Sequence, residues 1–86
     1  MDTLAIIKED IREILVKNGE QKLSDCLDMV QEETLTAIYN MVCDYQANRV
    51  QKQVVRLHVM EDIAAALEGR EAMFSKGYIP GQAKEA

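Results

Sequence analysis

The sequence predicts an all-α protein: a small bundle of three or four helices, with one long or once-broken helical stretch over about residues 32–68. Two observations support this fold class. From Glu32 to Glu68 the chain runs for 37 residues without Gly or Pro, and its apolar residues recur mostly three and four positions apart, which is the helical period. Its β-branched residues form no alternating apolar–polar run, so the sequence contains no strand signal.

The length of 86 residues is enough for one domain. We expect a single helical domain over residues 1–77, followed by a C-terminal turn and a frayed tail over residues 78–86. The turn-rich run SKGYIPG and the polar residues after it predict that tail. Hydrophobic residues make up 48% of the chain, which is too many for a disordered protein.

The first helix is predicted to begin at Asp2 or Thr3, because either side chain can cap a helix. It is predicted to end at Asn18-Gly19, because Gly readily adopts the left-handed conformation that closes a helix. Its apolar residues form one stripe, and charged residues occupy the other face. The stripe consists of Leu4, Ile7, Ile11, Ile14 and Leu15.

A short second helix is predicted from about Glu20 to Met29. The apolar spacing slips by one residue between Val30 and Leu35, and this slip predicts a turn around Val30-Gln31. Acidic residues at 32 and 33 then open the next helix, where the helix dipole favours negative charge. The alternative is one bent helix through this region.

The long stretch has a polar interruption in its middle. Gln46, Arg49 and Gln53 lie on the side that is apolar before and after them. Two structures explain this pattern. Either the helix breaks near 46–48, with Asn48 capping a new helix and Gln51 in the capping-box position, or it is continuous and the polar layer lies inside a partner interface.

A continuous helix would predict a dimer. It would span roughly 55 Å, and the first helix would cover less than half of that length. The uncovered apolar surface would need a second copy of the chain or another protein. We therefore expect a homodimer, a larger protein partner, or both, with Gln46, Arg49 and Gln53 setting the register of the contact.

The sequence predicts no catalytic, cofactor-binding or metal site. His58 is the only histidine, and a single histidine beside acidic residues makes an incomplete ligand set. Cys26 and Cys43 match no redox or zinc spacing and are expected to be buried, reduced thiols. The residues expected to be largely buried in the core are Ile11, Leu27, Ile38, Val42 and Leu57.

The net charge of −5 argues against nucleic-acid binding over the whole surface, which usually needs a basic footprint. No apolar run is long enough to span a bilayer, so we expect no membrane partner. The N-terminus lacks the pattern of a signal peptide, and the expected compartment is the cytoplasm.

One segment departs from this acidic balance. Residues 49–60 contain Arg49, Lys52 and Arg56 and no acidic residue. On a continuous helix these three would share one face. Such a basic stripe is either a solvated face, a partner for the acidic first helix of the same chain, or a contact surface for phosphate or for an acidic protein.

These features favour a non-enzymatic protein–protein interaction module: an adaptor, a complex subunit or a small inhibitor that occupies the surface of a partner. Its expected contact residues are Arg49, Lys52, Arg56, Gln46 and Gln53. The acidic first helix would suit a basic target, including a site that normally binds nucleic acid. The alternative is a nucleic-acid-associated regulator that uses the basic stripe.

Overall fold

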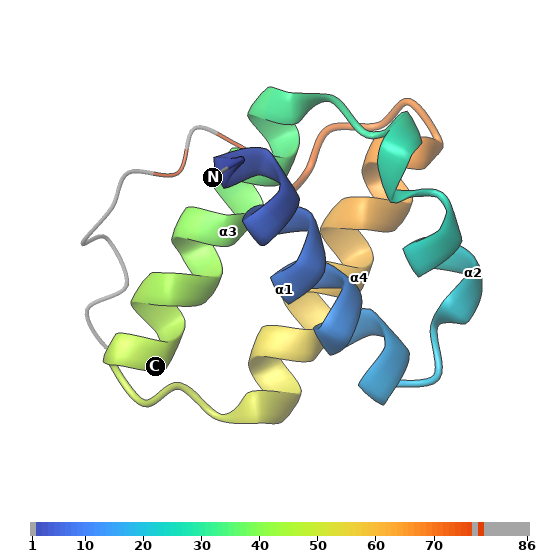
Figure 1. Cartoon of the computed structure of the whole chain (residues 1–86). Helices are drawn as coiled ribbons and strands as arrows, with labels where there is room; N and C mark the ends of the chain where they lie inside the picture. Colours follow the sequence, from blue (N-terminus) through green and yellow to red (C-terminus); the bar gives the residue numbers. More distant parts are fainter. Residues whose placement is uncertain (1, 77, 79–86) are drawn as a thin grey trace.

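The computed structural model describes residues 2–76 and 78, and helices account for 72% of it. No strand occurs within these residues, so the all-α prediction is confirmed. α1 (Thr3–Lys17) packs against the other three α-helices, which lie around it in Figure 1. These are α2 (Gln21–Asp25), α3 (Glu32–Ala47) and α4 (Lys52–Leu67), with a single 3-10 turn, η1 (Leu27–Met29), between α2 and α3.

α1 begins and ends where its caps predict. The Asp2 carboxylate accepts a hydrogen bond from the Leu4 amide at 3.1 Å, which satisfies one of the free N–H groups of the first turn. The helix closes at Gly19, whose φ of 77° is left-handed. Ile7, Ile11 and Leu15 form its buried stripe.

The second helix is shorter than predicted. α2 stops at Asp25 and the chain continues as η1, so the expected helix to Met29 is divided by Cys26. The predicted turn around Val30-Gln31 is confirmed, because both residues are extended and Gln31 stands at the N-cap of α3. The bent-helix alternative is therefore wrong.

The long stretch is broken. α3 ends at Ala47, α4 begins at Lys52, and the two helices pack against each other. The predicted capping role of Asn48 is wrong: this residue is the C-cap of α3, and its side chain donates to the Asp44 carbonyl at 2.8 Å. Gln51, and not Asn48, occupies the N-cap position of α4, where it makes no side-chain capping bond.

Four of the five predicted core residues are buried, namely Ile11, Leu27, Ile38 and Val42. The prediction for Leu57 is wrong, because 52% of this residue is exposed. The break lets α4 rotate independently of α3, and α4 buries the face that contains Val55, Val59 and Ile63. Leu57 lies two residues from Val55, about 200° around the helix, and therefore points away from the core.

The cysteines also differ from expectation. Cys43 is exposed and Cys26 is half-buried, and the two form no disulfide. Cys43 lies next to the buried Val42 on α3, so the register that buries Val42 turns the thiol towards solvent.

Residues after α4 fold back onto it. The carboxylate of Asp62, a fully buried residue of α4, accepts hydrogen bonds from the amides of Phe74 at 3.2 Å and Ser75 at 2.7 Å. Phe74 stacks on His58 with ring centroids 3.7 Å apart. We call residues 70–76 and 78 the C-terminal turn; residues 79–86 of the predicted tail lie outside the described part of the chain.

Candidate partner-binding groove

The turn between α3 and α4 opens a groove that α1 closes on its other side. Its volume is about 630 Å³. Ile14, Val42, Val50 and Val55 form an apolar floor, of which Val42 and Val55 are almost fully buried. Its polar and charged rim consists of Asp10, Glu13, Lys17, Tyr39, Cys43, Gln46, Arg49, Lys52 and Arg56. We call this feature the basic groove.

Four of the five predicted contact residues line the basic groove: Gln46, Arg49, Lys52 and Arg56. Gln53 is exposed but does not line it. The prediction that the three cations share one helix face is wrong for Arg49, which lies in the turn; only Lys52 and Arg56 are on α4. The turn itself brings Arg49 back beside the other two.

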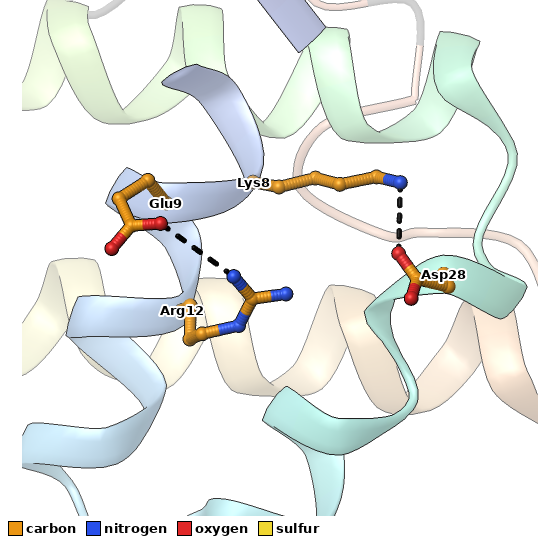
Figure 2. Close-up of polar contacts among 4 residues, drawn as sticks. All are labelled: Lys8, Glu9, Arg12 and Asp28. Atoms are coloured by element: carbon orange, nitrogen blue, oxygen red, sulfur yellow. Dashed lines mark hydrogen bonds and ion pairs between the residues drawn. The ribbon is translucent and has the colours of Figure 1, made fainter. Parts of the chain in front are cut away.

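Arg49, Lys52 and Arg56 differ from most other described cations because they form no ion pair with any described residue. Figure 2 shows two paired cations of α1: Lys8 binds Asp28 at 2.8 Å, and Arg12 lies 3.6 Å from Glu9. The cations that form no ion pair with any described residue are Lys22, Arg49, Lys52 and Arg56. Three of these four line the same groove.

Acidic side chains of α1 stand on the opposite wall. Glu13 is held by Lys17 at 2.8 Å, and this hydrogen bond and charge lower the pKa of Glu13. Asp10 lines the groove as well. The sequence leaves three alternatives for the basic stripe, one of which is pairing with the acidic first helix. In the structure the two line the same groove, and no ion pair between described residues joins them.

Arg49 has an unusual backbone for its residue type. Its φ is 58°, in the left-handed region that residues other than Gly, Asn and Asp seldom adopt. It stands at the position directly after the C-cap of α3, where the Val50 amide donates back to the Tyr45 carbonyl at 2.9 Å in a Schellman motif. α1 and α4 end with the same motif, and there Gly19 and Gly69 hold this position.

The helix end at Lys52 adds to the positive character of the groove. The N-cap residue Gln51 makes no side-chain capping bond, so the first amides of α4 keep their partial positive charge. Lys52, the first residue of α4, lines the groove at this point.

Sequence reasoning missed Asp10, Glu13 and Lys17 as groove residues, along with the apolar floor. The i, i+3 and i+7 spacing of these three puts them on one face of α1, but no sequence signal indicates which element this face meets.

On the wall formed by α3, the pKa of Tyr39 is raised, chiefly because its hydroxyl hydrogen bonds to the neighbouring Cys43.

His58 lies away from the groove residues, in a structural cluster. Its Nδ1 is hydrogen bonded to the Tyr45 hydroxyl at 3.0 Å, and its ring stacks on Phe74. Among the described residues no group of three or more His, Cys, Asp or Glu side chains could hold a metal ion. The described helices are also too short or too polar to cross a membrane.

The chain matches no protein-family model, no curated protein and no solved structure. The basic groove combines an apolar floor with three cations, Arg49, Lys52 and Arg56, that form no ion pair with any described residue.

Proposed function

We propose that this protein is a non-enzymatic interaction module, an adaptor, complex subunit or small inhibitor, and that it binds a protein partner through the basic groove. The observation that carries the proposal is the gathering of Arg49, Lys52 and Arg56, none of them paired with a described residue, around one apolar-floored groove of an acidic chain. Unpaired charges next to apolar surface are typical of the polar rim and apolar centre of a binding patch.

The conformation of Arg49 supports a role outside folding. A left-handed conformation costs an L-residue roughly 1–2 kcal/mol, and glycine avoids most of this cost. The ends of α1 and α4 use glycine at the equivalent position, whereas the end of α3 keeps arginine. Strain retained at one position is a reason to look for function there.

Site-specific photocrosslinking tests the proposal. A photoreactive residue is placed at Gln46, inside the groove, or at Gln53, an exposed residue of the same type outside it. In extract we expect a discrete protein adduct from position 46 that weakens when Arg49, Lys52 and Arg56 are replaced by Gln. An adduct that survives this replacement unchanged, or equal adducts from both positions, would contradict the proposal.

The mass of the adduct also tests self-association. The break between α3 and α4 folds the apolar stretch back on itself, so the uncovered length that predicted a dimer is absent from this fold. An adduct of twice the chain mass would identify a second copy as the occupant of the groove. A different mass would identify a heterologous protein.

A nucleic-acid-associated regulator is the second candidate, and the same unpaired cations favour it. Its contact with phosphates would release counterions, so binding to DNA or RNA should weaken steeply with salt. A mobility shift at low salt that is lost in the Arg49→Gln, Lys52→Gln, Arg56→Gln variant would support this candidate. Absence of any shift at low salt would remove it.

A further inference from the structure

The charge distribution within the basic groove indicates what kind of partner it fits. We infer that its occupant is an acidic amphipathic helix of another protein, whose apolar residues lie on the groove floor and whose carboxylates face the turn between α3 and α4. This inference rests on the proposed function, because it names the partner chemistry of that same site.

The floor of the basic groove is suited to contact with apolar side chains. Val42 and Val55 are nearly buried beneath the groove, and Ile14 and Val50 are partly exposed within it. A volume of about 630 Å³ accommodates a few side chains but not a folded domain. An amphipathic helix can supply such side chains at i, i+3, i+4 and i+7 along one face.

The wall of the groove at the turn between α3 and α4 is suited to contact with negatively charged groups. Arg49, Lys52 and Arg56 are unpaired there, and the uncapped N-terminus of α4 adds partial positive charge. Carboxylates directed at this wall would form charge-assisted hydrogen bonds that no described residue now provides.

The wall formed by α1 disfavours a uniformly charged polyanion. Asp10 and Glu13 line it together with Lys17, which pairs with Glu13, so the wall keeps an excess of negative charge, and the whole chain carries a net charge of −5. A nucleic acid presents phosphates in every direction and would bring some of them near these carboxylates. An amphipathic helix can direct its acidic face to one wall only, which is why the observations favour a protein segment.

Synthetic helical peptides of about four turns test this inference. The acidic peptide carries Leu on one face and Glu on the next. Two controls replace every Glu by Gln or by Lys and keep the Leu face. Binding is followed from the amide NMR signals of the intact protein, so that perturbed residues identify the surface that is used.

We expect the acidic peptide to shift signals of groove residues and to bind at least about tenfold more tightly than the Gln peptide, a difference that shrinks as salt rises. Replacing Arg49, Lys52 and Arg56 by Gln should weaken binding of the acidic peptide by about tenfold or more. The Lys22→Gln variant serves as the matched control, because Lys22 is an exposed, unpaired cation outside the groove, and it should bind as the unmodified chain does.

Equal binding of the acidic and Gln peptides, absence of binding by the acidic peptide, or tighter binding of a DNA duplex of similar length would overturn the inference. If position 46 still gives a protein adduct that depends on Arg49, Lys52 and Arg56, only the partner chemistry is wrong. If the adduct is missing as well, the proposed function fails with it.

Discussion

The C-terminal turn and the basic groove differ in whether their charged side chains have partners among the described residues. The C-terminal turn is held by the fully buried Asp62 of α4, which accepts hydrogen bonds from the Phe74 and Ser75 amides. In the groove, Arg49, Lys52 and Arg56 form no ion pair with any described residue. A buried charge that lacked partners would cost several kcal/mol, so Asp62 requires its donors. A solvated charge has no such requirement, so the groove cations are available for intermolecular contacts.

The comparison separates residues that hold the fold from residues that we propose bind a partner. Polar groups of the first kind should affect stability strongly when they are replaced. Polar groups of the second kind should affect binding while leaving stability nearly unchanged.

Replacing a buried core residue should cause the largest loss of stability. Replacing Ile38, which is fully buried, with Ala should lower the free energy of unfolding by about 2–5 kcal/mol, because burial is lost and a cavity remains. The exposed Leu57 provides the control, and Leu57→Ala should change stability by less than about 1 kcal/mol. Urea denaturation measures both, and equal losses would mean that the face of α4 assigned to the core is wrong.

Asp62→Ala should destabilise the protein by about 2–4 kcal/mol, because two amides of the C-terminal turn lose their acceptor. Asp62→Asn keeps one acceptor oxygen and should lose less. Hydrogen exchange at Phe74 and Ser75 gives the local readout and should accelerate in both variants. Unchanged exchange at these amides in the Ala variant would show that the carboxylate does not hold the turn.

Arg49→Gly should raise the free energy of unfolding by about 1 kcal/mol, because glycine accepts the left-handed conformation with less strain. The matched control is Arg49→Ala, which removes the same charge without relieving the strain and should give no such gain. Thermal or urea denaturation distinguishes the two variants. A loss of stability with glycine would mean that the Arg49 side chain contributes to the fold itself.

Tyr45 should make stability depend on alkaline pH. Burial, followed by the negative charge of Asp62, raises the pKa of its phenol. The folded state therefore favours the neutral form. This contribution is complete below the unfolded pKa of about 10 and is lost as the pH rises through the higher folded value. The stability difference between the unmodified chain and Tyr45→Phe should change over this window, and the absence of any change there would contradict the assignment.

Much of the fold could be predicted because its signals are local. The Asp2 cap, the glycine after α1 and the phase slip near Val30 each act within a few residues, and each prediction is confirmed. The break at the end of α3 left two interpretations open because its left-handed residue is Arg49 and not glycine. The exposure of Leu57 follows from this break, since the phase of α4 cannot be extrapolated across it.

The site was only partly predictable, for a different reason. The absence of acidic residues between 49 and 60 marks the basic segment in the sequence itself. The groove also needs the α1 wall of Asp10 and Glu13, which depends on how helices distant in sequence pack. The role of Asp62 was missed because a carboxylate on an apolar helix face looks like an interruption until its amide partners are in place.

The stability of the Arg49→Gln, Lys52→Gln, Arg56→Gln variant in urea at low salt, beside that of the unmodified chain, separates a role in binding from a role in folding. Glutamine removes the charge, keeps a polar side chain and leaves the left-handed backbone at position 49 without glycine. If these cations serve a partner and not the fold, the free energy of unfolding should change by less than about 1 kcal/mol. A loss of about 2 kcal/mol or more would show that they hold α1 through Asp10 and Glu13, and that the groove is part of the folding architecture.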